Sequence, residues 1–126
     1  MKPKPTPTQS ELEILQVLWQ QGPCTVRQVN DRLNEDRSVG YTTTLKTMQI
    51  MFDKGLLARE KEKRTHIYEP LIPEREVKDR FIDQLAEEAF KGSAMQLVMH
   101  ALGRSKATKE EMDAIRQLLD DHNETS

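Results

Sequence analysis

The stretch that decides the fold is Tyr41–Leu57, YTTTLKTMQIMFDKGLL. In a helix of about 3.6 residues per turn, its polar side chains share one face and its methionines lie on the other. The polar face consists of Thr42, Lys46, Gln49 and Asp53. Hydroxyl, amide and ammonium groups suit base edges and phosphates, whereas a face that serves solubility alone usually carries Glu and Lys. The pattern indicates a DNA recognition helix, although a Thr-rich amphipathic helix without a ligand also fits it.

Two short helices are predicted before this one, each opened by a capping box in which a threonine hydroxyl and a Glu or Gln side chain satisfy free backbone amides. The boxes pair Thr8 with Glu11 and Thr25 with Gln28. Gly22-Pro23 ends the first helix, and residues 34–40 form a polar loop after the second. Their apolar stripes are expected to enter a core: Leu12, Leu15 and Trp19, then Val26, Val29 and Leu33.

A hairpin is predicted after the recognition helix, which Gly55 ends in the position of a left-handed C-cap. The runs 56–61 and 65–69 favour strands, are separated by Glu62-Lys63-Arg64, and stop at Pro70. Three helices followed by a basic hairpin is the order of a winged helix-turn-helix. In that fold the third helix enters the major groove of DNA and the wing reaches phosphates.

From Pro73, which suits a first helical position, the pattern is helical again. Gly92 interrupts it, Ser93 caps a further helix, and Thr108 to Glu111 is a third capping box. The last residues, Asp120 to Ser126, are expected to fray. About fifty residues in three helices are too few to bury their apolar stripes alone, so they either cover the winged domain or pair with a second copy. Pairing is preferred, through Val77, Phe81, Leu85, Ala89, Val98, Leu102, Ile115 and Leu119.

The charge is unevenly spread along the 126 residues, whose net charge is -2. Up to Pro70, eleven Lys and Arg oppose nine Asp and Glu, a balance of +2; from Leu71 onward, eight oppose twelve, a balance of -4. The basic part suits DNA, although an ordinary solvated surface explains so small a difference as well.

Other classes of function are not expected. The lone Cys24 excludes an intramolecular disulfide, and the three histidines lack metal-ligand spacing, so neither a metal nor a cofactor is expected. The lone Cys24 has no histidine near it in sequence, so the chain is not expected to be an enzyme. No apolar run approaches the length of a membrane span, and the N-terminus lacks the pattern of a signal peptide, which predicts a cytoplasmic protein that does not enter membranes.

The predicted fold class is therefore mainly α with a small β-hairpin. Its parts are a disordered basic and proline-rich arm over residues 1–7, a winged helix-turn-helix DNA-binding domain over 8–72, and a helical dimerisation region over 73–126.

The order of these motifs resembles that of the penicillinase repressor family, the BlaI, MecI and CopY type, along nearly the whole chain. The matching segments are Thr8 with Glu11, Ile14-Leu15 to Leu18-Trp19, Tyr41-Thr42-Thr43 with Leu45, Lys54-Gly55-Leu56-Leu57, Arg64, Tyr68 with Pro70-Leu71, and Phe90-Lys91-Gly92-Ser93 with Leu97-Val98. The resemblance implies a dimeric transcriptional repressor with an N-terminal winged helix and a C-terminal helical dimerisation region. The two-fold symmetry of a homodimer in turn predicts a palindromic operator.

Three features depart from the family pattern. Met99-His100-Ala101 stands where members inactivated by a signalling protease carry an Asn-Phe pair, and the paired C-terminal cysteines of copper-responsive members are absent. Ile50 stands where relatives often carry a basic residue, which removes a phosphate contact. The resemblance therefore implies the family's DNA-binding role for the N-terminal half of this chain, but it does not indicate the inducing signal or an upstream sensor.

The candidate DNA-binding residues come from three places in the fold. Thr42, Thr43, Lys46 and Gln49 are expected to face the groove, and Lys63 and Arg64 at the hairpin tip to meet phosphates. Arg27 and Tyr41 are candidates for backbone contacts, although Tyr41 could instead pack at the helix start. The expected partners are double-stranded DNA and a second copy. A winged helix that binds only proteins stays open as the alternative.

Overall fold

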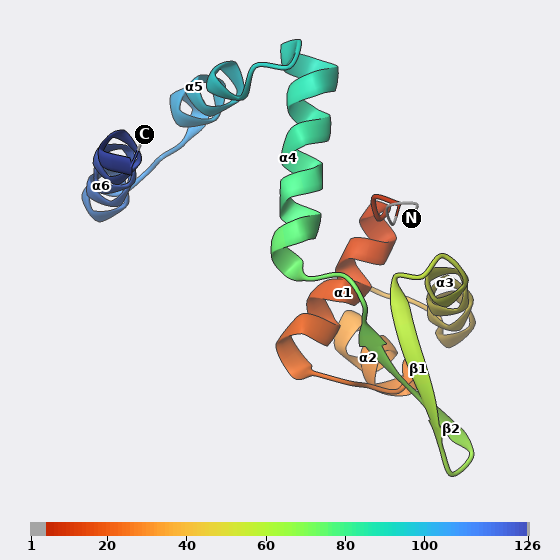
Figure 1. Cartoon of the computed structure of the whole chain (residues 1–126). Coiled ribbons are helices and arrows are strands. Elements are labelled where there is room, and N and C mark those ends of the chain that lie inside the picture. The colour runs from red at the N-terminus through yellow and green to blue at the C-terminus, as the bar shows by residue number, and fades with distance from the viewer. Residues whose placement is uncertain (1–4, 126) are drawn as a thin grey trace. The chain divides into compact units, whose positions relative to one another are not determined.

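The structure is a computed structural model that describes residues 5–125. Residues 1–4 and 126 lie outside the described residues, and with them most of the expected disordered arm, residues 1–7. The elements are α1 (Gln9–Gln21), α2 (Val26–Leu33), α3 (Tyr41–Asp53), β1 (Leu57–Glu62), β2 (Thr65–Pro70), α4 (Glu74–Phe90), α5 (Ala94–Arg104) and α6 (Lys109–Thr125) (Figure 1). They form two compact units, Met1–Phe81 and Ile82–Ser126.

The predicted capping boxes are confirmed. At the start of α1, Thr8 Oγ1 accepts the Glu11 N–H at 3.2 Å and Glu11 Oε1 accepts the Thr8 N–H at 2.9 Å. Thr25 and Gln28 exchange the same pair of bonds at the start of α2, at 3.1 and 2.8 Å. Each box satisfies two backbone donors that would otherwise lack partners, so local side chains determine where both helices begin.

The end of α3 is a Schellman motif built on Gly55, which has a φ of +82°. The Gly55 N–H donates to the Phe52 carbonyl at 3.1 Å, and the Leu56 N–H donates to the Met51 carbonyl at 2.9 Å. This confirms the predicted left-handed cap, because that φ is readily adopted only by glycine. The turn directs the chain from α3 into β1, and Leu56 and Leu57 enter the core.

The wing is the antiparallel pair β1 and β2, in which Leu57 lies opposite Pro70 and Glu62 opposite Thr65. Both strands end one residue later than expected, so Glu62 and Pro70 belong to the ladder and the tip is the two-residue turn Lys63-Arg64. The hairpin projects beyond α1, α2 and α3 (Figure 1). Its base is anchored because Tyr68 exchanges backbone hydrogen bonds with Cys24, at 2.8 and 3.0 Å.

The core of the first unit lies between the three helices and the base of the wing. Its fully buried members include Leu15, Leu18, Val29, Met48, Met51, Leu56, Leu57, Tyr68, Ile72 and Val77. The Trp19 indole packs against it and donates to the Ile72 carbonyl at 3.1 Å. Because the first turns of α4 add Val77 and part of Phe81 to this core, the compact unit extends beyond residue 72.

The second unit has little core of its own. Among its described residues, Ala86 is the only buried apolar side chain, and α5 contains no buried residue. Local bonds nevertheless define its helices: Ser93 Oγ accepts the Gln96 N–H at 3.1 Å, and Thr108 and Glu111 form the predicted capping box. No helix in residues 5–125 is long and apolar enough to cross a membrane.

Two helix boundaries also differ from prediction. The helix α4 begins at Glu74, because the Pro73 carbonyl accepts the Val77 N–H at 3.2 Å and so places Pro73 at the cap rather than at the first helical position. The expected fraying from Asp120 is wrong: α6 continues to Thr125, and Gln117 Nε2 donates to Asp121 Oδ1 at 2.9 Å on its last turns. Such a contact four residues along stabilises a helix end.

Candidate nucleic-acid interface

The two faces of α3 are sharply different. Thr42, Thr43, Lys46 and Gln49 all lie on its solvent-facing side, and none of them is buried. On the opposite face Met48 and Met51 are fully buried, and Thr44 is 1% exposed. The buried methionines fix the rotation of the helix about its own axis, so the polar face is directed toward solvent.

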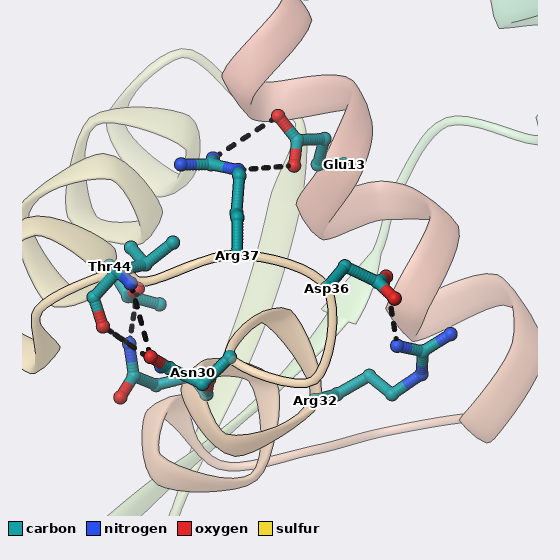
Figure 2. A network of polar contacts seen from close by, with 8 residues as sticks. Glu13, Asn30, Arg32, Asp36, Arg37 and Thr44 are labelled. Carbon is teal, nitrogen blue, oxygen red and sulfur yellow. Dashed lines mark hydrogen bonds and ion pairs between the residues drawn. The ribbon is translucent and has the colours of Figure 1, made fainter.

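Side-chain amides from α2 and the residue after it hold the first turn of α3 (Figure 2). Asn30, itself buried, donates through Nδ2 to Thr44 Oγ1 at 2.8 Å and to the Val39 carbonyl at 3.0 Å. Asn34 holds the loop between α2 and α3 in the same way: its side-chain amide donates to the Val39 carbonyl at 2.8 Å and accepts a hydrogen bond from the Val39 N–H at 3.1 Å. The turn between the second and third helices is therefore ordered largely by hydrogen bonds.

Several cations of the first unit are already engaged by acids. Arg37 forms a bidentate pair with Glu13 of α1, at 3.0 and 3.2 Å (Figure 2). Arg32 lies 3.1 Å from the carboxylates of both Glu35 and Asp36. Lys54 meets the buried Glu11 carboxylate at 2.8 Å. These charges are neutralised within the unit and are poorly placed to attract phosphates.

Other cations have no such pairs. Within residues 5–125, none of Arg27, Lys46, Lys63 and Arg64 belongs to an ion pair, and all four reach solvent. The Arg27 guanidinium stacks on the Tyr41 ring, with Cζ 5.4 Å from the ring centroid, and Tyr41 remains 44% exposed. Tyr41 thus supports Arg27 instead of packing into the core.

A hollow of about 410 Å³ lies where the start of α2, the face of α3 and β2 meet. Its walls are Thr25, Val26, Arg27, Tyr41, Leu45, Gln49, Arg64, Thr65, His66 and Tyr68. Four predicted residues are thereby brought together: Arg27, Tyr41, Gln49 and Arg64. The other four do not line the hollow, because Thr42, Thr43 and Lys46 lie on the adjoining face of α3 and Lys63 lies at the wing turn.

Three polar residues of this hollow were not predicted as site residues from the sequence: Thr25, Thr65 and His66. The sequence pattern indicates Thr25 only as a helix cap. Alternation along β2 could have found His66, since it shares a face with the buried Tyr68, two residues away, and the two rings meet edge to face at 6.3 Å.

The wing is held beside α3 by a stacked cation. The Arg59 guanidinium of β1 lies over the Phe52 ring of α3, with Cζ 3.9 Å from the ring centroid. This contact holds the base of the hairpin beside α3.

Cys24, near the base of the wing, is a structural residue. Its thiol is buried, lies 3.2 Å from the Gly22 carbonyl, and has a pKa raised by that burial. The thiol is therefore protonated at neutral pH, which is the unreactive form of cysteine.

The predicted dimerisation residues divide by exposure. Val77 is fully buried in the core of the first unit and Phe81 packs partly against it, so Val77 is not available to a partner. Leu102 and Ile115 are half-buried. The exposed members are Leu85, Ala89, Val98 and Leu119.

Comparison with known proteins shows the family of this chain. The family model described as penicillinase repressor matches residues 7–121. The transcriptional regulator BlaI of Mycobacterium tuberculosis is 32% identical over 111 residues, which cover 86% of this chain and 79% of that protein. The penicillinase repressor of Bacillus licheniformis is 26% identical over 123 residues, 97% of this chain and 95% of the relative.

A solved structure from the same family matches part of the chain. It is the monomeric form of Bacillus licheniformis BlaI in complex with the blaP half-operator, with a TM-score of 0.51, 28% identity, and coverage of 59% of this chain and 90% of that one. This structural match agrees with the winged-helix geometry and with the family match over residues 7–121. The chain belongs to the penicillinase repressor family of DNA-binding transcriptional regulators.

Proposed function

We propose that this chain represses transcription as a homodimer that binds a palindromic operator, with one α3 in the major groove of each half-site. Thr42, Thr43, Lys46 and Gln49 contact bases or the groove, Lys63 and Arg64 of the wing contact phosphates, and Arg27 and Tyr41 contact the backbone beside the hollow. Because its ligand is chromosomal DNA, the protein acts in the cytoplasm.

The observation that carries this proposal is the separation of paired from unpaired cations. Arg32, Arg37 and Lys54 have carboxylate partners, whereas Arg27, Lys46, Lys63 and Arg64 border the hollow, the α3 face or the wing turn without one among the described residues. Unpaired, solvent-accessible cations release counterions when they meet phosphates, which drives DNA binding even for a protein of negative net charge.

The second unit supports the dimer. Leu85, Val98 and Leu119 are 48%, 48% and 55% exposed. Large apolar side chains gathered on helices that lack a core favour a second copy as their cover. The related Bacillus licheniformis BlaI was solved as a monomeric form on a half-operator, which supports one protomer per half-site.

The direct test is operator binding by the full chain, with a duplex selected from a random pool. Changing Thr43 and Lys46 together to Ala should weaken binding by about 1–3 kcal/mol for each base that these side chains recognise. Fluorescence anisotropy at several salt concentrations measures both the affinity and its salt dependence. Unchanged values for this double variant would overturn the assignment of the α3 face.

The wing is tested in the same titration. Changing Lys63 and Arg64 to Ala should weaken binding to all sequences about equally and lower the salt slope by about two units, roughly one for each phosphate contact. The matched control is Lys78→Ala, an exposed lysine of α4 that is paired with Glu74 and should leave the slope unchanged. Absence of binding to any duplex at low salt would instead favour a protein-interaction module.

A further inference from the structure

Ile50 is an apolar residue in the middle of the polar face of α3. It is 42% exposed, whereas Met48 and Met51, two residues before it and one after it, are fully buried. It belongs neither to the core of the first unit nor to the apolar residues packed against that core. Helical spacing places it on the same face as Thr43 and Lys46, seven and four residues earlier.

A single exposed isoleucine is common on protein surfaces and indicates nothing by itself. Ile50 is informative because its neighbours on this face of α3 all have polar or charged side chains: Thr42, Thr43, Lys46, Gln49 and Asp53. If this face enters the major groove, Ile50 must lie against either the backbone or the base edges.

The chemistry favours base edges. Phosphate oxygens are recognised by donors, and Ile50 has none. Asp53, one turn further on the same face and also exposed, would be repelled by a phosphate at that end of α3. Among the groups that base pairs present in the major groove, the apolar one is the C5-methyl of thymine. A β-branched side chain in a helix is held near one rotamer, so such a contact is formed at little entropic cost.

Resting on the proposed function, we infer that Ile50 determines operator specificity by packing against the C5-methyl group of a thymine in each half-site. The α3 helix then reads DNA in two ways: Thr42, Thr43, Lys46 and Gln49 use hydrogen bonds, and Ile50 adds an apolar contact.

The test removes the C5-methyl group of thymine from the DNA and leaves the rest of the duplex unchanged. The full-length protein first selects its preferred duplex from a random pool, and each thymidine of the half-site is then replaced in turn by deoxyuridine. One replacement should weaken binding of the unaltered protein by about 3- to 10-fold, the scale of one buried methyl group. Ile50→Ala should bind the thymine duplex more weakly by a similar factor and should lose all sensitivity to the replacement.

Two proteins, unaltered and Ile50→Ala, are thus compared on two duplexes, with and without the thymine methyl group. This comparison separates the contact between Ile50 and the methyl group from other effects of the substitution on binding. Gln49→Ala, on the same face, should bind more weakly yet keep its sensitivity to deoxyuridine. Thermal unfolding should be unchanged by Ile50→Ala, because the side chain is exposed. If no deoxyuridine replacement weakens the unaltered protein, the inference is overturned while the selected operator still supports the proposed function. If no sequence is enriched from the pool, the proposed function itself fails.

Discussion

At the scale of single residues, the contact between Glu11 and Lys54 joins distant parts of the chain. The Glu11 side chain is 4% exposed and the Lys54 side chain 33%. The carboxylate accepts Lys54 Nζ at 2.8 and 3.0 Å and the Thr8 N–H at 2.9 Å. One buried acid therefore caps α1 and also ties α1 to the C-terminal end of α3.

Removing the cation of this pair should be costly. In Lys54→Met the buried Glu11 carboxylate loses its cation and keeps only the hydrogen bond from the Thr8 N–H. We therefore expect the free energy of unfolding to fall by about 1–2 kcal/mol, a range that allows for the water that already reaches Lys54. Urea unfolding followed by circular dichroism measures the change. In the control Lys78→Met, an exposed pair with Glu74 is removed, at a cost below about 0.5 kcal/mol. Equal destabilisation of both variants would contradict the role given to Glu11.

At the scale of elements, the turn at Gly55 sets the path from α3 into the wing. Its φ is +82°, and a Cβ added there would meet no atom within 4 Å. The penalty of Gly55→Ala is therefore backbone strain alone, about 1–2 kcal/mol in the free energy of unfolding. Gly103→Ala also meets no atom, but it lies inside α5 without a positive φ and should be neutral or stabilising. Urea unfolding of both variants tests the contrast, which fails if Gly55→Ala is as stable as the unaltered protein.

The helices and turns also show which features of the fold can be predicted from the sequence. Capping boxes at Thr8, Thr25 and Thr108, the cap at Gly55 and the two faces of α3 were predictable because each depends on residues within a few positions of one another. The ion pair from Glu11 to Lys54 and the bond from Asn30 to Thr44 were not, because they join residues that only the folded chain brings together. The hollow that unites Arg27 with Arg64 belongs to the same class.

Val77 illustrates the limit of a periodic pattern. The apolar stripe of α4 is continuous in sequence, and from it Val77, Phe81 and Leu85 look alike. In the structure Val77 is fully buried in the winged unit, whereas Leu85 is 48% exposed. Periodicity identifies a buried face but does not say what buries it, so the stripe alone cannot separate residues that complete the monomer core from residues left for a partner.

At the scale of the whole molecule, the two units differ in what they bury. The first has a closed core, whereas the second leaves large apolar side chains exposed: Ile82, Leu85, Met95, Val98, Met99, Leu118 and Leu119. Covering Leu85 or Leu119 against a second copy would contribute on the order of 1.5–3 kcal/mol each. A closed two-fold dimer would then present two recognition helices to half-sites about one helical turn apart, roughly 34–36 Å, or a multiple of that spacing.

Pairing, more than any single base contact, should set the affinity for the operator. Once one protomer is bound, binding of the second half-site becomes intramolecular, so the full site can be held roughly 10²–10⁴ times more tightly than one half. Leu85→Asp places a charge on the exposed apolar stripe while leaving the winged core intact. We expect it to sediment as a monomer, to keep its affinity for an isolated half-site, and to lose most of the advantage of the full operator.

The matched control for this last prediction is Gln84→Asp, which introduces the same charge one position earlier on α4, at an exposed polar residue. It should remain dimeric, because its side chain is turned by about 100° from that of Leu85 around the helix axis. Sedimentation velocity and anisotropy on half and full sites distinguish the two variants. An unaltered protein that is monomeric at micromolar concentration, or a Leu85→Asp variant that binds the full site as tightly as the unaltered protein, would show that the second unit has another role.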